Sequence, residues 1–577
     1  MKWWQCPPRR YHFELCREFL EGKKKERILS MEMDRLCAFL KKHYLFCNLV
    51  GISIFLFFFE LGNRGFENKD VSRYAEMSRE MIQTGNWMTT GYHDTIYLSK
   101  PPMLMWLIAI FSSIGHQVTP FTARIPSALA GLTGVLMTYY FVQRFFHRRT
   151  AFIAAVILAT TQKYFWHCRI IRTDMIFAVC ITLALYFFYL GYKQKQRYYV
   201  GFYFSLVITF LTKGPLGILF VMSIIAAFLV CRKDLNAFKR MKWRWGFGLF
   251  ILPIGIFCLI LCVKIGLEPL VATLKREFLT RVNDPISHSE PFYYYFVKIW
   301  SDFLPWSLFI PFVVVYAFKR WRDGDELGIF MFCWIVVIFV FLCAAKAKSS
   351  RYMLPLYPAI SILMARIIDD TLAGKIVKPL WVRLFAYWII RIMAALAALL
   401  LVVGPSYLWN YSWIGVILSL VVFMTGFKMF LSLRQRYKLI HMSLVICIFT
   451  IILGWGMFIH GLTRYYENES LGAKLTFTLE KELGGLHAYD IREFHIENSF
   501  RDAINLNLNV SVPLIKNIHD LKIFLDTTEY HPLCIIEKHT FENVKNTIMD
   551  NTLSTLDVHT KEYQVTLVFK RNQQKIY

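Results

Sequence analysis

The sequence predicts an all-α polytopic membrane protein of about 13 transmembrane helices, followed by a small C-terminal α/β domain. The composition is the first observation: of 577 residues, 56% are hydrophobic, 17% aromatic and only 18% charged, too much apolar surface for a soluble protein. The second is a series of apolar runs of about 17–25 residues, the length that a helix needs to cross hydrocarbon. The third is an abrupt change to polar sequence near residue 462.

The formal net charge is +26, from 66 Lys and Arg against 40 Asp and Glu. In a soluble protein this excess would suggest binding to nucleic acid. Here the basic residues cluster in short loops between apolar segments, where they indicate topology and contacts with anionic lipids. We therefore expect membrane lipids, and no nucleic acid, among the partners.

Three parts are predicted along the chain. Residues 1–43 are polar and basic, which is typical of a cytoplasmic N-terminal tail, and the transmembrane domain is expected over 44–461. The predicted spans are 44–62, 124–146, 151–168, 174–192, 197–212, 214–231, 246–265, 303–319, 327–344, 352–367, 383–403, 412–432 and 438–459.

The apolar segment 102–115 is only about 14 residues long and follows Pro101, which is short for a span. The positive-inside rule decides its placement. If it does not cross, basic loops such as Arg144 to Arg149 and Arg232 to Arg244 face the cytoplasm. We therefore place it among juxtamembrane helices of the first outer loop, and residues 462–577 also lie outside.

The C-terminal region 462–577 mixes two patterns. Strand-like pieces occur at 533–537 and 563–570, and helix-like pieces at 469–483 and 512–525. This mixture predicts a small α/β domain on the outer side.

Charged residues on the predicted outer side break the rule that outer loops are poor in Lys and Arg. They are Asp70, Arg73, Lys100, Arg169, Arg172, Asp174, Lys213, Lys346, Lys348 and Arg351. A phosphate group bound at the membrane surface would explain the cations, because Arg and Lys hydrogen-bond phosphate oxygens. The alternative is that each cation neutralises a nearby carboxylate or contacts lipid headgroups.

Two acids in this set are candidate catalytic residues, Asp70 and Asp174. A carboxylate beside a phosphate-linked sugar can take the proton from an acceptor hydroxyl that attacks the anomeric carbon. The cations would disperse the charge of the leaving phosphate, which gives an inverting mechanism. Asp174 opens a span, so it could instead cap that helix.

The loop 266–302 contains His288 and Glu290, which could bind a metal or contact substrate. One His with one acid is a weak metal signal, and an ordinary loop is the alternative.

These residues lie in stretches that resemble the large-loop, lipid-carrier-dependent glycosyltransferases of the protein O-mannosyltransferase superfamily. Within them the chain is most similar to the bacterial aminoarabinose transferases that modify lipid A. The stretches include Asp70-Val71-Ser72-Arg73-Tyr74, Lys100-Pro101-Pro102-Met103, Thr173-Asp174-Met175, Lys213-Gly214-Pro215, His288-Ser289-Glu290-Pro291 and Arg351-Tyr352-Met353-Leu354-Pro355.

The resemblance implies roles for individual residues. It makes Asp70 and Asp174 the essential acids, and it assigns Arg73, Tyr74, Tyr97, Lys100 and Tyr352 to the cavity for the carrier phosphate. We add Arg172, Lys213, Lys348 and Arg351 as phosphate-binding candidates. In two positions the chain departs from the family, since Val71 and Ser99 stand where Glu is usual. The second Glu is a metal ligand with a loop His in the family, so a divalent metal at His288 is doubtful and no cofactor is certain.

The first hypothesis is therefore an inner-membrane bacterial enzyme with a cytoplasmic N-terminus and a periplasmic C-terminal domain. It would move a sugar, such as 4-amino-4-deoxy-arabinose, from undecaprenyl phosphate to lipid A or a related envelope acceptor. One alternative is a polyprenyl-phosphate-mannose protein O-mannosyltransferase. Another is a flippase for lipid-linked sugars, although transporters tend to show internal repeats and mid-membrane sites.

Overall fold

The computed structural model describes residues 43–66, 69–89, 91–92, 95–275 and 290–372, and parts of the C-terminal region. Those parts are 455–456, 459, 489–494, 501–502, 504–506, 512–526, 531–549, 552–559 and 564–570. Internal contacts divide the chain into two compact units, Met1–Ile52 and Ser53–Tyr577. Every site discussed below lies within the second unit.

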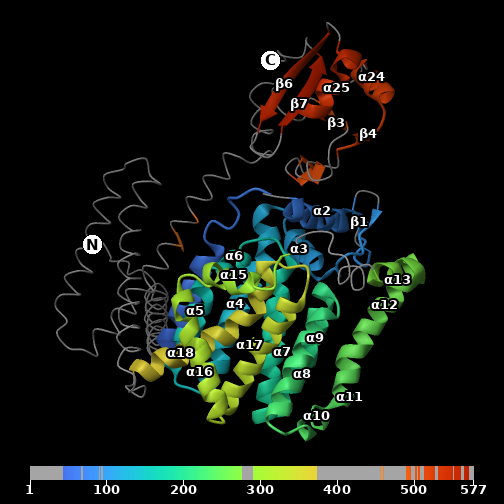
Figure 1. Cartoon of the computed structure of the whole chain (residues 1–577). Helices are drawn as coiled ribbons and strands as arrows, with labels where there is room; N and C mark the ends of the chain where they lie inside the picture. Colours follow the sequence, from blue (N-terminus) through green and yellow to red (C-terminus); the bar gives the residue numbers. More distant parts are fainter. Residues whose placement is uncertain are drawn as a thin grey trace, which may run out of the picture. The chain divides into compact units, whose positions relative to one another are not determined.

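The described part of the chain contains five helical segments long and apolar enough to cross a membrane (Figure 1). They are α4 (Pro120–Gln143), α7 (Thr173–Lys193), Trp243–Ile265, α17 (Glu326–Ala344) and Ser350–Thr371. Shorter apolar helices cover His43–Phe58, α3 (Met103–Ser113) and α9 (Leu216–Cys231). The prediction of a mostly helical, multi-pass membrane protein is confirmed.

Further helices connect and flank these segments. They are α2 (Lys69–Thr84), α5 (Arg148–Thr160), α6 (Gln162–Cys168), α8 (Tyr198–Lys213), α10 (Asn236–Lys239), α13 (Leu267–Lys275), α15 (Tyr294–Asp302) and α16 (Ile310–Arg322). Trp243–Ile265 consists of α11 (Trp243–Gly246), the π-helix η1 (Phe247–Ile251) and α12 (Leu252–Ile265). Two 3-10 turns precede helices, η3 (Trp306–Phe309) before α16 and η4 (Ser350–Leu356) before α18 (Tyr357–Leu372).

The structure interrupts one predicted helix, over 151–168, and agrees with the short length predicted for the segment 102–115. The helix predicted over 151–168 is not continuous, because Thr161 is extended (φ −65°, ψ 126°) and separates α5 from α6. At this break the Gln162 amide donates to the carbonyl of Leu304 instead of continuing the helix, at 2.8 Å. The helix α3 has 11 residues, in line with the short segment expected. The predicted spans at 383–403 and 412–432, and most of 438–459, lie outside the described residues.

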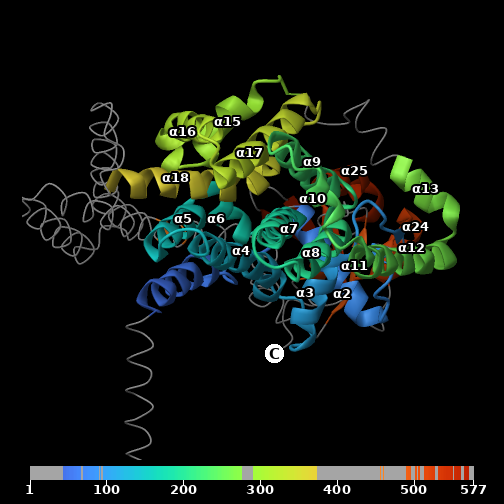
Figure 2. The ribbon, with the colours of Figure 1, turned by 90° about the horizontal axis from the view of Figure 1, so that it is seen from below.

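Glycines on α4 allow neighbouring helices to pack closely against it. On α4, a Cβ at Gly131 would collide with the Cys168 sulfur, and one at Gly134 with the Tyr164 hydroxyl. Small residues at such crossings let helix backbones pack directly in membrane proteins. Figure 2 shows the resulting bundle along its helices, with α18 between α5 and α16.

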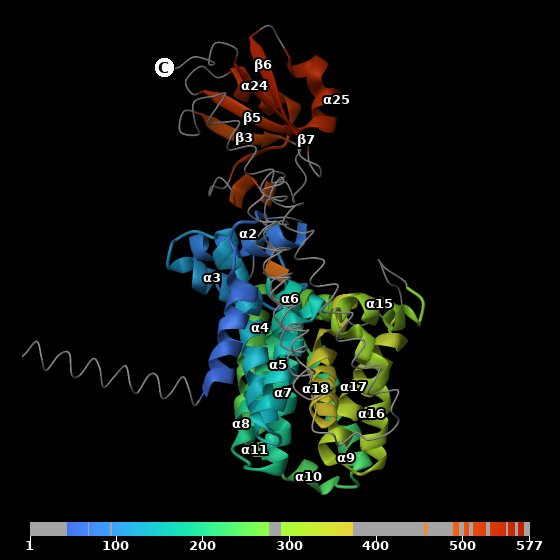
Figure 3. The same ribbon diagram turned by 90° about the vertical axis from the view of Figure 1, so that its left-hand side faces the viewer.

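The C-terminal region contains a five-stranded sheet in the order β4-β3-β5-β7-β6 (Figure 3). Its strands are β3 (Asp490–Phe494), β4 (Leu514–Ile515), β5 (Pro532–Glu537), β6 (Leu553–His559) and β7 (Gln564–Lys570). β3 runs parallel to β4 and β5, whereas β7 is antiparallel to β5 and β6. Strands β5 and β7 lie where strands were predicted.

Alternating side chains give this sheet two apolar faces. One face, with Cys534, Ile536 and Val568, packs against α24 (Ile518–Asp526) and α25 (Lys538–Ile548). The other face packs against Ile504 and Val512. The helix predicted over 512–525 is wrong in its first part, because Leu514 and Ile515 pair with β3 and the helix begins only at Ile518. The helix predicted at 469–483 lies outside the described residues.

Glu493 on β3 is a fully buried carboxyl group. Arg501 Nε lies 3.3 Å from Glu493 Oε2, and Glu76 and Asp502 add negative charge nearby. Burial is the largest influence and raises the pKa of Glu493 from 4.5 to about 8, with the two acids acting in the same direction and Arg501 against it.

This shift predicts a pH-dependent stability. Between pH 4.5 and 8 the folded protein keeps a proton that the unfolded chain has released, so stability falls as pH rises through this window. Each pKa unit corresponds to about 1.4 kcal/mol, so the loss amounts to several kcal/mol. We expect Glu493→Gln to remove this part of the pH dependence in thermal unfolding of the purified protein. Glu542→Gln, at an exposed position of α25, serves as the control, and an unchanged pH profile in Glu493→Gln would contradict the assignment.

Candidate functional site

Three charged residues that are distant in the sequence meet at one end of α7. Asp174, in the first turn of α7, is 6% exposed, and its Oδ1 accepts a hydrogen bond from Lys213 Nζ. Arg351 Nε lies 3.9 Å from Asp174 Oδ2. Lys213 is the last residue of α8 and Arg351 belongs to η4, so the site joins three elements.

The turn after α8 depends on a glycine. Gly214 adopts φ 72° and ψ −156°, a conformation that side-chain-bearing residues avoid. It ends α8 directly after Lys213, and Pro215 then leads into α9. The sequence Lys213-Gly214-Pro215 thus fixes the lysine at the end of the helix, where it reaches the start of the neighbouring α7.

Aromatic rings surround the two cations of this group. Lys213 Nζ lies 4.9 Å from the centroid of the Phe177 ring and 5.6 Å from that of Tyr352. The Arg351 guanidinium lies 5.5 Å from the Tyr352 ring. Cation–π contacts of this kind stabilise positive charge in partly desolvated sites. Arg351 keeps 32% of its side chain exposed, so the group retains a positive face that an anion can reach.

A second group of candidate residues begins on α2. Asp70 lies in the first turn of this helix, and Arg73 follows three residues later. The Arg73 guanidinium lies 5.8 Å from the Tyr74 ring and 5.7 Å from the Tyr97 ring. Tyr97 and the half-buried Lys100 follow the hairpin of β1 (Gly91–Tyr92) and β2 (Thr95–Ile96).

One apolar core connects the two groups. Tyr74 on α2 belongs to the same buried cluster as Ile171, Ile176 and Cys180 around the start of α7, and Tyr97 packs against this cluster. Arg172 immediately precedes α7. Candidate residues from α2, the hairpin, α7, α8 and η4 therefore lie at one end of the helical bundle, as Figure 1 also shows for α2 and α6.

Comparisons with known proteins bear on this arrangement. Residues 99–260 match the family described as dolichyl-phosphate-mannose-protein mannosyltransferase. The undecaprenyl phosphate-alpha-4-amino-4-deoxy-L-arabinose arabinosyl transferase 2 of Proteus mirabilis is 28% identical over 391 residues, which are 64% of this chain and 68% of that protein. An uncharacterized protein of Aquifex aeolicus is 27% identical over 348 residues, 60% of this chain and 67% of its own.

The fold comparison agrees with the sequence comparisons. The crystal structure of ArnT from Cupriavidus metallidurans bound to undecaprenyl phosphate superimposes with a TM-score of 0.72 and 18% identity. It covers 93% of this chain and 100% of that one. These comparisons support a glycosyltransferase that resembles the lipid-carrier-dependent membrane enzymes in sequence and in fold. The matched family segment of this glycosyltransferase contains Lys100, Arg172, Asp174 and Lys213, whereas Asp70, Arg73 and Arg351 lie outside it.

Two of the cations in the predicted outer set are buried and donate to backbone carbonyls. Arg169 is 2% exposed and donates hydrogen bonds to the carbonyls of Leu56, at 3.0 Å, and Phe59, at 2.7 Å. Arg169 therefore serves backbone carbonyls, a partner that neither the phosphate hypothesis nor its alternative named. Lys348 is 6% exposed and donates to the carbonyl of Ala345 within its own turn. His288 lies outside the described residues, and among those that are described no cluster of three metal-binding side chains occurs.

One group beside the site was not predicted from the sequence. His167 on α6 is 5% exposed, its Nδ1 lies 2.9 Å from the carbonyl of Lys163, and it is within electrostatic range of Asp174. On the same helix, Lys163 forms an ion pair with Asp302 at 3.7 Å. The sequence signal for this group is the spacing of Lys163 and His167, which lie four residues apart at the end of an apolar segment.

Breaking the Asp174–Lys213 pair tests how far the site depends on it. We expect Lys213→Met to destabilise the glycosyltransferase by about 3 kcal/mol, because it leaves a buried carboxylate with a single, more distant cation. Thermal unfolding in detergent measures the loss, and adding Asp174→Asn should recover part of it.

The pair between Lys193, at the other end of α7, and Glu326 provides the matched control. Its lysine is 40% exposed, so Lys193→Met should cost less than about 1 kcal/mol. Equal losses in the two lysine variants would contradict the proposed importance of the buried pair.

Proposed function

We propose that this glycosyltransferase moves a sugar from undecaprenyl phosphate to lipid A or a related envelope acceptor, with inversion at the anomeric carbon. The observation that carries the proposal is the group of Asp174, Lys213 and Arg351, which presents a partly exposed cation beside a buried ion pair. Support for the donor comes from the names of the arabinosyl transferases and from the carrier in the ArnT crystal structure.

In this proposal the two groups of cations hold the donor phosphate. Arg351 and Arg73 would supply paired N–H donors, and Lys100 and Arg172 further positive charge. Tyr97 and Tyr352, each beside an arginine, would complete the cavity. Asp174 would hold Lys213 and Arg351 in place, since a carboxylate engaged by two cations is a poor proton acceptor.

The general base is then assigned to Asp70. Its carboxylate would take the proton of the acceptor hydroxyl while the hydroxyl oxygen forms a bond to the anomeric carbon. The bond between that carbon and the phosphate oxygen breaks at the same time, and the electron pair stays with the polyprenyl phosphate. The surrounding cations stabilise the charge that develops on this leaving group.

The sugar, acceptor and topology are part of the same proposal. The names of the relatives favour 4-amino-4-deoxy-arabinose as the sugar. Their bacterial sources and the apolar helices of this chain favour a location in a bacterial inner membrane. Residues 1–43 would form a cytoplasmic tail, 44–461 the transmembrane domain and 462–577 a periplasmic domain. The family description matched by residues 99–260 favours a second candidate, protein O-mannosylation with a Ser or Thr acceptor.

Mass spectrometry of lipid A tests the acceptor. We expect an added sugar mass in cells with the wild-type gene, and its loss in the deletion strain and in Asp70→Asn. Asp520→Asn, at an exposed position of α24, is the matched control and should retain the product. Unmodified lipid A in all strains would refute the acceptor assignment, and glycopeptides in its place would establish the mannosyltransferase alternative.

Kinetics of the purified enzyme separate the proposed roles. Asp70→Asn should lower kcat by at least about 100-fold with little change in KM, because the base acts mainly in the transition state. Arg351→Met should raise the KM for the donor, because it removes a contact made already in the bound state. A normal kcat in Asp70→Asn would exclude it as the base.

A further inference from the structure

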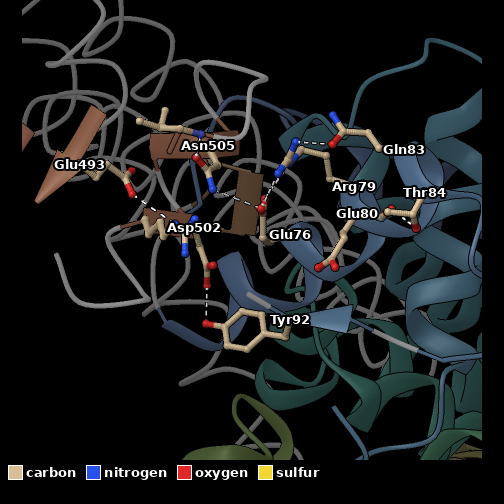
Figure 4. Close-up of polar contacts among 11 residues, drawn as sticks. Glu76, Arg79, Glu80, Gln83, Thr84, Tyr92, Glu493, Asp502 and Asn505 are labelled. Carbon is tan, nitrogen blue, oxygen red and sulfur yellow. Dashed lines mark hydrogen bonds and ion pairs between the residues drawn. The ribbon is translucent and has the colours of Figure 1, made fainter. Parts of the chain in front are cut away.

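Buried polar contacts connect α2 to the C-terminal domain (Figure 4). Asn505 Nδ2 donates to Glu76 Oε1 at 3.3 Å, and the Tyr92 hydroxyl donates to Asp502 Oδ2 at 2.9 Å. Asp502 is fully buried and Asn505 is 1% exposed. Polar groups buried this deeply require hydrogen-bond partners, so loss of either contact would leave a costly unpaired group.

The α2 side of the contact is itself rigid. Arg79 donates to both carboxylate oxygens of Glu76, at 2.8 and 2.6 Å, and a third N–H donates to Gln83 at 2.8 Å. Glu76 and Arg79 are 3% and 4% exposed. The bidentate geometry fixes the orientation of the carboxylate that Asn505 contacts.

The orientation of the Asn505 amide is also determined. Its Oδ1 accepts from the Val512 amide at 2.9 Å, so its NH2 group must face Glu76. Val512 packs on the face of the sheet formed by Leu533 and Ile535. The sheet is therefore linked through the Asn505 side chain to the middle of α2.

These contacts lie next to the candidate donor site. Glu76 follows Arg73 by three residues on α2, and Tyr92 belongs to the hairpin that precedes Tyr97. The hairpin also touches α2, since a Cβ at Gly91 would collide with the Glu80 carboxylate. The two contacts therefore reach both elements that carry this part of the site.

We propose that Asn505 and Asp502 are positioning residues of the donor site, through which the C-terminal domain holds α2 and the β1–β2 hairpin. The orientation they fix is the one that lets Asp70, Arg73 and Tyr97 meet the lipid-linked sugar. The role given to these three residues rests on the proposed function, whereas the holding of α2 does not.

An amide–carboxylate exchange tests this proposal. Asn505→Asp keeps the acceptor for the Val512 amide but places a carboxylate against Glu76, which should repel α2. The double variant Glu76→Gln/Asn505→Asp restores a hydrogen bond, in which the amide at position 76 donates to the carboxylate at position 505. We expect Asn505→Asp to lower kcat/KM at least tenfold and the double variant to recover most of it, a coupling between the two sites.

Hydrogen exchange of the full-length protein gives a readout that needs no activity. Amides of α2 should exchange faster in Asn505→Asp and slow again in the double variant. Asn517→Asp, at the exposed contact of Asn517 with Asp520, is the control for adding a charge to this domain.

Tyr92→Phe, which removes only a hydroxyl, should lower kcat/KM severalfold without a large change in thermal unfolding.

The outcomes distinguish the two levels of the proposal. If α2 exchange responds as expected but the wild type transfers no sugar from undecaprenyl phosphate, the positioning stands and the proposed function fails. If Asn505→Asp leaves both exchange and kcat/KM unchanged, or if Glu76→Gln gives no recovery, the positioning role is refuted.

A separate observation concerns the opposite end of the bundle. A pocket of about 610 Å³ lies where α4 ends, α5 begins and α16 and α18 end. Its lining is rich in arginine and aromatic side chains. The lining residues are Arg144, Phe145, Phe146, His147, Thr150, Arg320, Arg366, Asp369 and Asp370.

The two acids of this pocket already have partners. Asp369 accepts from Thr150 at 2.6 Å, and Asp370 accepts from Tyr316 at 2.7 Å and from Arg320 at 2.8 Å. Arg366, 7% exposed, lies 2.6 Å from Asp325 and 4.6 Å from the Phe146 ring centroid.

Two further lining residues offer hydrogen-bond donors outside these pairs. Arg144 and His147 are exposed, and in the part of the chain that the structure describes Arg144 bonds to the Tyr140 hydroxyl and to no carboxylate. We infer that this pocket binds the phosphate headgroup of an anionic phospholipid, with Arg144 and His147 as its principal donors. Basic pockets between helix ends at the basic side of a membrane protein suit such headgroups.

Nanodiscs of defined composition test the lipid site. Adding phosphatidylglycerol to phosphatidylcholine discs should raise the Tm of the wild type but not of Arg144→Gln/His147→Gln, and native mass spectrometry should show fewer retained phosphatidylglycerol molecules in that variant. Arg197→Gln, at the same end but outside the pocket, should behave as the wild type. A Tm increase with inorganic phosphate alone would assign the pocket to free phosphate, and an equal response of all variants would refute the site.

Discussion

The buried carboxylate of Asp174 is the constraint on which the candidate site depends. An ionised group taken out of water must be compensated by charges and hydrogen bonds within the protein. Lys213 and Arg351 provide this compensation, and they come from α8 and η4. The need to neutralise one carboxylate therefore fixes the relative positions of three elements and places two cations at the same end of the bundle.

Buried arginines compensate backbone carbonyls in a similar way around the loop that precedes α2. Arg124 donates to the carbonyls of Arg64 and Gly65, at 2.6 Å each, while Arg64 donates to the carbonyl of Arg169 at 2.9 Å. Carbonyls at the ends of helices lack partners within their helix. These buried arginines satisfy them and tie together the loop that leads into α2, on which Asp70 and Arg73 lie.

An element could be predicted where neighbouring residues determine it, and was missed where residues distant in the chain determine it. Long apolar helices such as α7 and α17 were predictable, because crossing hydrocarbon requires a continuous apolar sequence. The break at Thr161 was not, because it depends on the carbonyl of Leu304. The strand β4 was read as helix, since its two residues are defined only by pairing with β3 about twenty residues earlier in the chain.

By itself the sequence determined the membrane class and the mostly helical fold, since hydropathy is a sum over neighbouring residues. It also singled out the charges that are predicted to lie on the outer side. Only the tertiary structure decided which charges act together. Arg169 and Arg351 are the same residue type on the same predicted side, yet one binds backbone carbonyls and the other faces Asp174. That difference comes from long-range contacts, which set the partners of a side chain independently of its sequence neighbours.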